Sequence, residues 1–184
     1  MSQSMRFLRA LVEGDVVAVR GLLAEDPALA VAMFEPGAHK NPPMLAAVRV
    51  PGFDGHGEKI PSRLKKDAAR ARIVALLARH GADVNQRYAR GVRPLHMAAR
   101  YGLARCIEML VSLGADPDAR DVRKETALFR AANLGHEDAV AALVRLGVDA
   151  QVKNREGQRA IDRARRKGFA TIASLLQGAS SERG

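Results

Sequence analysis

The chain has 184 residues, of which 47% are apolar but only 4% aromatic, with no Trp, so its core must be built from Ala, Leu and Val. No apolar run approaches the roughly 18 residues of a membrane span. The single cysteine, Cys106, excludes an internal disulfide, and no secretory signal is evident, so we expect a cytoplasmic protein. The net charge of +10 favours anionic partners.

A period of 33 residues runs through much of the chain. Three independent series of positions share this period, which leaves little room for chance. Each period predicts two short helices, because apolar residues recur at helical spacing and a Gly follows each helix. The series are Gly81, Gly114 and Gly147, then Gly102, Gly135 and Gly168, and finally Arg93, Thr126 and Arg159.

The first unit, residues 4–36, contains two helical patterns that lie on either side of Gly14. The dipeptide Asp26-Pro27 ends the second of these helices, because Pro cannot continue the backbone hydrogen-bond pattern. This unit has the same two-helix plan as the later ones and forms the first end of the array.

The second unit, residues 37–86, is irregular. Its segment NPPMLAA precedes the equivalent RPLHMAA of the third unit by 52 residues instead of 33, an excess of 19. We place the excess between the two helices of the unit, in an insertion at residues 50–66 whose Pro and Gly residues exclude a continuous helix. The second helix then spans residues 67–79. An insertion of this length is either functional or disordered.

The third unit, residues 87–119, shows the regular pattern most clearly. Its first helix begins at Pro94 and ends at Gly102, and its second runs from Ala104 to Leu113. The polar, turn-rich stretch ahead of the first helix predicts a hairpin loop. The later elements are a fourth unit at 120–152, a fifth unit at 153–178 with helices at 161–167 and 170–177, and a flexible tail at 179–184.

The runs RPLHMAARYG and LVSLGAD resemble the ankyrin repeat, which has a period of 33 and the signature T-P-L-H-x-A. The resemblance covers nearly the whole chain. It implies an all-α solenoid of five stacked helix-turn-helix units with hairpin loops. Arg93 departs from the Thr of the signature, and Ala127 and Phe129 replace its Pro and His in the fourth unit. His96 and His136 occupy repeat-defining positions, so we interpret both as structural.

The resemblance also places a partner-binding surface, because in ankyrin arrays the hairpin loops and the first-helix ends line one concave face. Carried over by register, this face holds a column of basic residues with Tyr101 and Leu134 as anchors, and Tyr and Arg are frequent in interface hot spots. The alternative is that these charges serve solubility alone. The predicted partner-binding residues are Arg90, Val92, Arg100, Tyr101, Arg123, Glu125, Asn133, Leu134, Arg155, Gln158, Arg166 and Lys167, with Phe53 and His56 of the insertion.

Nothing in the sequence predicts catalysis. Phosphate-binding Gly-rich loops and nucleophile motifs are absent, and Cys106 lies on an apolar helix face, where a buried inert thiol is expected. Asp54, His56 and Glu58 alternate as metal ligands could, but they lack the spacing and support of a real site. We therefore expect no catalytic residues, no metal and no cofactor.

The leading hypothesis is a monomeric, non-catalytic module that binds an acidic surface on a partner protein, as an inhibitor or immunity protein or as an adaptor. The high Ala content and the excess of Arg (23) over Lys (7) suggest a bacterial gene. Nucleic-acid binding is an alternative that the charge favours, although aromatic residues are few and no reading motif is visible. Head-to-tail self-association is another, because the first 36 residues carry −2 and the last 32 carry +5.

Overall fold

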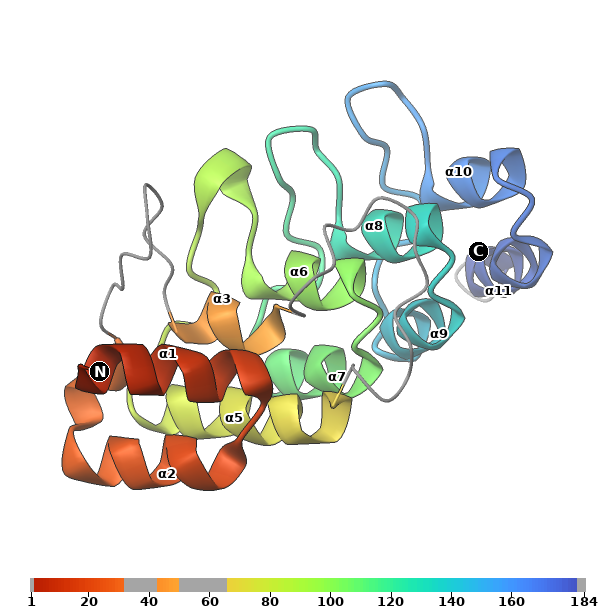
Figure 1. Cartoon of the computed structure of the whole chain (residues 1–184). Coiled ribbons are helices and arrows are strands. Elements are labelled where there is room, and N and C mark those ends of the chain that lie inside the picture. Colours follow the sequence, from red (N-terminus) through yellow and green to blue (C-terminus); the bar gives the residue numbers. More distant parts are fainter. Residues whose placement is uncertain (1, 32–42, 50–65, 182–184) are drawn as a thin grey trace.

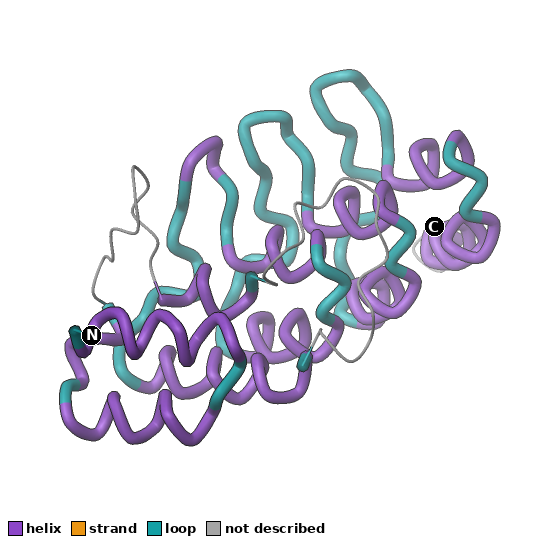
Figure 2. The backbone as a smooth tube through the Cα atoms, viewed as in Figure 1, coloured by secondary structure: helices purple, strands orange, loops and turns teal. Residues whose placement is uncertain are grey.

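The computed structural model describes residues 2–31, 43–49 and 66–181, and this part of the chain consists of helices, turns and loops (Figures 1 and 2). The predicted all-α solenoid is confirmed. The α-helices are α1 (Gln3–Glu13), α2 (Val16–Glu25), α3 (Pro43–Val48), α5 (Asp67–Arg79), α6 (Pro94–Arg100), α7 (Ala104–Ser112), α8 (Ala127–Leu134), α9 (Glu137–Arg145), α10 (Ala160–Arg166) and α11 (Ala170–Ser181), with short 3-10 turns η1 (Pro27–Ala30) and η2 (Ala89–Gly91).

The helices form two rows. The first helices of successive units, α1, α3, α6, α8 and α10, pack side by side in one row, and α2, α5, α7, α9 and α11 pack in the other. The loops ahead of α6, α8 and α10 project beyond the first row, on the side away from the second (Figure 1). One face of the array therefore consists of hairpin loops and first helices.

Small residues hold the first row together. Ala98 and Ala99 of α6, and Ala131 and Ala132 of α8, are all fully buried. Because Ala adds only a methyl group, the two helices can approach closely and still fill the space between them. The second row supplies the larger side chains of the core: Val74, Ile107, Leu110, Val140 and Leu143, each fully buried. Each such side chain contributes about 1.5–3 kcal/mol on burial.

Most helix bounds agree with the sequence prediction. Helix α5 spans Asp67–Arg79 as predicted, and α1 and α2 flank Gly14, which ends α1 with a φ of 71°. The predicted end of α11 at Gln177 is wrong: the helix continues to Ser181, so residues 179–181 of the predicted tail are helical. Apart from Lys66, the predicted insertion at 50–66 lies outside the described residues.

The first turn of α5 connects three units. The guanidinium of Arg70, only 1% exposed, donates to the carbonyl oxygens of Val12 (2.7 Å) and Ala47 (2.8 Å), near the ends of α1 and α3. Cations are favourable at helix C-termini because of the helix dipole. In the other direction, the Asp67 carboxylate accepts the backbone N–H groups of Arg105 (2.8 Å) and Cys106 (3.0 Å) in the first turn of α7. This turn therefore ties the first and third units to the second.

The hairpin loops are joined at their tips by backbone hydrogen bonds. The N–H of Val122 donates to the carbonyl of Arg90, and the N–H of Arg155 donates to that of Arg123, each at 2.9 Å. Lys124, at the tip of the fourth unit's hairpin, has a φ of 58°. The residues 33 positions before and after it are both Gly with positive φ, Gly91 (69°) and Gly157 (75°). Lys124 thus occupies a left-handed position that its neighbours fill with Gly.

Replacing Lys124 with Gly should stabilise the protein by roughly 0.5–1 kcal/mol, because relief of the left-handed strain exceeds the entropy that Gly adds to the unfolded chain. Urea unfolding followed by circular dichroism measures this change. Lys124→Ala is the matched control, since it removes the same charge but keeps a Cβ. A Gly variant no more stable than the Ala variant would show that the backbone at this position is not strained.

Candidate partner-binding groove

A groove of about 580 Å³ lies between the hairpin loops and the first helices of the third to fifth units. Its walls come from the loops that precede α6 and α8, and its floor from α6, α8 and α10. We call this feature the groove. Its lining residues are Arg90, Val92, Met97, Arg100, Asp121, Val122, Arg123, Glu125, Arg130, Asn133, Leu134 and Arg163.

The repeat period places these side chains together. Met97, Arg130 and Arg163 are 33 residues apart and occupy the same position on α6, α8 and α10. Because the first helices pack side by side, residues at one register position form a row across the floor. Arg90 and Arg123 form a similar row along the hairpin tips. Any register position that faces away from the core thus becomes a continuous strip of surface.

The floor contains one buried ion pair. The Arg130 guanidinium lies 2.6 Å from the carboxylate of Asp121, whose side chain is only 2% exposed. Burial alone would raise the pKa of Asp121, but hydrogen bonds from Arg130 and from the N–H groups of Glu125 and Arg123 hold this pKa below its ordinary value. Asp121 also closes its own hairpin through those two N–H groups. Arg130 is therefore committed to the fold.

The remaining arginines give the groove a positive field. Its described lining residues include five arginines and two carboxylates. Arg123, 70% exposed, lies 4.0 Å from the Glu125 carboxylate, a weak contact. Within the described part of the chain, Arg90, Arg100 and Arg163 form no ion pair; Arg163 donates instead to the amide oxygen of Asn133 at 2.7 Å. Burial, and next the charge of Asp121, raise the pKa of Glu125 above its ordinary value.

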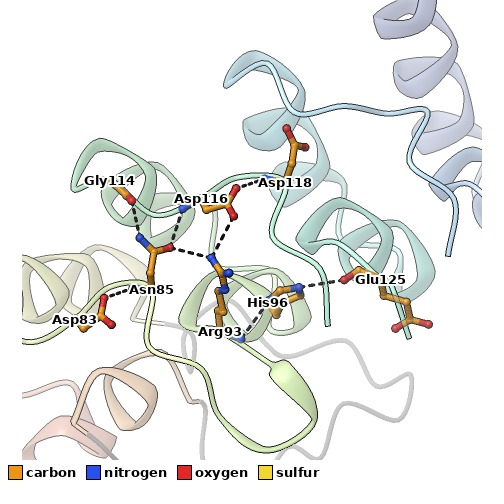
Figure 3. Close-up of polar contacts among 8 residues, drawn as sticks. All are labelled: Asp83, Asn85, Arg93, His96, Gly114, Asp116, Asp118 and Glu125. Atoms are coloured by element: carbon orange, nitrogen blue, oxygen red, sulfur yellow. Dashed lines mark hydrogen bonds and ion pairs between the residues drawn. The ribbon is translucent and has the colours of Figure 1, made fainter. Parts of the chain in front are cut away.

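A polar network fixes the hairpin that carries Glu125 (Figure 3). The fully buried His96 accepts the N–H of Arg93 at Nδ1 (3.2 Å), which leaves Nε2 to donate to the backbone carbonyl of Glu125 (3.1 Å). The Arg93 side chain donates to the Asp116 carboxylate at 3.1 Å. Asn85 accepts the N–H of Asp116 (2.9 Å) and donates to the carbonyl of Gly114 (2.7 Å). The hairpin that forms this wall of the groove is thus anchored by hydrogen bonds to the third unit.

The groove brings together seven of the predicted partner-binding residues and leaves out the others. Tyr101 was expected to be a surface anchor, and that expectation is wrong: it is only 3% exposed and belongs to the hydrophobic core, because the chain turns inward after α6. Phe53 and His56 lie outside the described residues. The seven are Arg90, Val92, Arg100, Arg123, Glu125, Asn133 and Leu134, while Arg155, Gln158, Arg166 and Lys167 of the fifth unit lie outside the groove.

Of the other five lining residues, Val122 lies on the hairpin of the predicted Arg123, and the predicted set lacked Met97, Asp121, Arg130 and Arg163. Three of these last four could have been found, because Met97 lies three residues before Arg100 on one helix face and its register position continues at Arg130 and Arg163. Asp121 could not, because its burial depends on the ion pair with Arg130.

The other side chains that could be reactive or bind a metal have structural roles. Cys106 is fully buried, its sulfur lies 3.6 Å from the backbone oxygen of Asp67, and burial raises the pKa of its thiol well above the ordinary value. The His136 ring contacts the carbonyl of Arg100 at 2.9 Å, from one unit to the next. Among the described residues, no group of three His, Cys, Asp or Glu side chains could hold a metal ion. No helix in the described part is long and apolar enough to span a bilayer.

The stability of the fold should fall as pH drops from about 6.5 to 4. Burial, and next the charge of Arg130, lower the pKa of His96 to about 4. Between these pH values His96 is protonated in the unfolded chain but stays neutral in the folded chain, so acid favours unfolding. At pH 5 this lowers the free energy of unfolding by about 2 kcal/mol.

Urea unfolding near pH 7.5 and near pH 5 tests this expectation. The variant His96→Gln keeps a hydrogen-bond donor and an acceptor but cannot titrate. Its loss of stability between pH 7.5 and pH 5 should therefore be smaller than that of the wild type by about 2 kcal/mol. Equal pH dependence in the two proteins would mean that His96 titrates normally in the fold.

The sequence model of one protein family matches this chain. It is described as ankyrin repeats (3 copies) and matches residues 67–121 and 95–182, from α5 to the end of α11. No curated protein matches the chain significantly. The matched part contains the groove, the network around His96 and the hairpin loops described above. This chain belongs to the ankyrin-repeat family.

Proposed function

We propose that this protein is a non-catalytic binding module whose groove takes up an acidic surface of a partner protein. Ankyrin repeats generally mediate protein–protein interactions and are typically not enzymes. The observation that carries the proposal is the surplus of arginine in the groove, where Arg90, Arg100 and Arg163 lack a carboxylate partner within the described residues. An acidic partner would supply the missing counter-charges.

Electrostatic complementarity suits recognition by such a surface. Exposed charges at a rim accelerate encounter with an oppositely charged partner and reject like-charged ones, whereas buried contacts determine how long the complex lasts. Arg90 and Arg123 lie exposed at the hairpin tips, and Met97 and Leu134 provide partly buried apolar area below them. The groove combines both kinds of contact.

Nucleic acid fits the groove less well. Among the described residues, no aromatic side chain lines it, so these residues offer bases no stacking platform. Asp121 and Glu125 also place carboxylates where phosphates would lie. The net charge of +10 attracts polyanions nonspecifically, and we interpret such attraction as separate from the function of the groove.

The proposal covers two biological roles that use the same surface. An inhibitor or immunity protein would cover an acidic region of one cognate enzyme, and an adaptor would join such a region to another protein. We place the chain in the cytoplasm as a monomer, in keeping with its single buried cysteine. The identity of the partner decides between the two roles.

Reversing charge in the groove should weaken partner binding at least about tenfold, mainly through slower association. The variant carries Arg90→Glu and Arg123→Glu. Wild-type protein on beads captures partners from a native, nuclease-treated lysate, and each captured protein is then purified and titrated against wild type and variant at two salt concentrations. The difference between the two proteins should shrink at high salt.

A matched control carries Arg72→Glu and Arg79→Glu, two exposed positions on α5 in the second row of helices, with the same change in net charge. It should bind the partner nearly as well as wild type does. If both variants lose affinity for the partner equally, net charge alone explains the effect. If the groove variant binds with unaltered affinity, the binding surface lies elsewhere. Capture that depends on nucleic acid would favour the alternative function.

A further inference from the structure

The groove changes character along the array. In the third unit, Val92 on the wall and Met97 on the floor form an apolar area, flanked by Arg90 and Arg100. At the equivalent positions of the fourth unit stand Glu125 and Arg130, and the floor continues with Arg163 in the fifth. A partner that lies along the groove therefore meets an apolar seat first and a charged floor one and two units further on.

The arginines of the fourth and fifth units differ in how far the protein's own carboxylates neutralise them. Arg130 is neutralised by Asp121, as shown by their 2.6 Å contact. Arg123 above it has only the 4.0 Å contact with Glu125, and Arg163 has no ion pair among the described residues. Carboxylates of a partner would therefore be best placed in two positions, near Arg123 in the fourth unit and near Arg163 in the fifth.

The size of the groove limits what can enter it. A volume of about 580 Å³ is that of a site for a small ligand or a few side chains, not for the broad face of a folded domain. Packed helices lie about 8–10 Å apart, and an extended chain advances about 3.3 Å per residue. An extended segment that lies along the array therefore covers one unit in about three residues.

We propose that the groove binds an extended segment of the partner protein, with one aliphatic side chain seated on Val92 and Met97 and acidic residues about three and six positions away, beside Arg123 and Arg163. This inference rests on the proposed function and adds the chemistry and spacing of the recognised segment. The segment lies along the array and runs either from the third unit to the fifth or from the fifth to the third.

A displayed library of random peptides of about twelve residues tests the spacing directly, because about six residues separate the outermost contacts. Peptides are selected on the full-length wild-type protein and depleted on the variant that carries Arg123→Gln and Arg163→Gln. The expected consensus is one Leu, Ile, Val or Met and two acidic residues at fixed distances of about three and six. A consensus without acidic residues, or without fixed spacing, would overturn the proposal.

A coupling experiment tests the apolar seat. The synthetic consensus peptide, and a version with Ser in place of its aliphatic residue, are titrated against wild type and Met97→Gln. Met97→Gln should weaken the aliphatic peptide roughly five- to tenfold and leave the Ser peptide nearly unchanged, because only the first loses an apolar contact. Leu175→Gln, on the exposed surface of α11, is the control and should change neither affinity.

Thermal unfolding of every variant confirms that it is folded. Failure of this proposal can be told apart from failure of the proposed function: a captured partner that needs Arg90 and Arg123 while the library yields no consensus refutes the extended segment alone. A single-stranded DNA of similar length that binds as tightly as the consensus peptide would also refute it, because the groove would then recognise charge without side-chain chemistry.

Discussion

Each helical hairpin of this protein is too small to bury its own apolar face, so it must stack against the hairpins on either side. The first helices meet through methyl groups, as at Ala98, Ala99, Ala131 and Ala132, and so cannot shift along one another without opening voids or clashes. This stacking sets the register between units. The groove, its rows of arginine and the hydrogen bonds between hairpin tips all follow from that register.

The first helices of the third, fourth and fifth units begin at the same register position, and each has backbone N–H groups there that need a hydrogen-bond acceptor. The units supply that acceptor with different side chains. In the third unit the N3 side chain of His96 accepts the N–H of Arg93, and in the fifth the carboxylate of Asp162 accepts that of Arg159 at 2.9 Å. In the fourth the hydroxyl of Thr126 accepts the N–H of Phe129 at 3.3 Å instead. These are the two halves of a capping box, and either half satisfies one exposed N–H group. The departures from the family signature therefore keep its function at the helix N-terminus.

A second register position lies at the start of each second helix, within the first turn of α5 and just before α7, α9 and α11, and it also carries side chains of different kinds. Residues 33 apart here are Arg70, Leu103, His136 and Phe169. Arg70 donates to the carbonyls of Val12 in the first unit and of Ala47 in its own unit, and His136 contacts the carbonyl of Arg100. The Phe169 ring covers Gly135 so closely that an added Cβ would lie 2.9 Å from it. Arg70, His136 and Phe169 each contact the unit that precedes their own. A regular backbone can thus carry side chains of quite different chemistry.

The period and the Gly stops in the sequence determined the helices, their order and the hairpin loops, because local spacing of apolar residues and left-handed Gly positions are properties of short segments. Together with the resemblance to the ankyrin repeat, they also placed Arg90, Arg123 and five further residues on the face where the groove lies. Only the tertiary structure decided which of those side chains reach solvent. Tyr101 lies in the core, Asp121 is buried beside Arg130, and Arg163 lines the groove floor with Met97 and Arg130. The physical reason is that exposure depends on side chains of the adjacent units, about 33 residues away, and ion pairing on the loop conformation that brings Asp121 to Arg130, nine residues further along. The local spacing of apolar residues specifies neither.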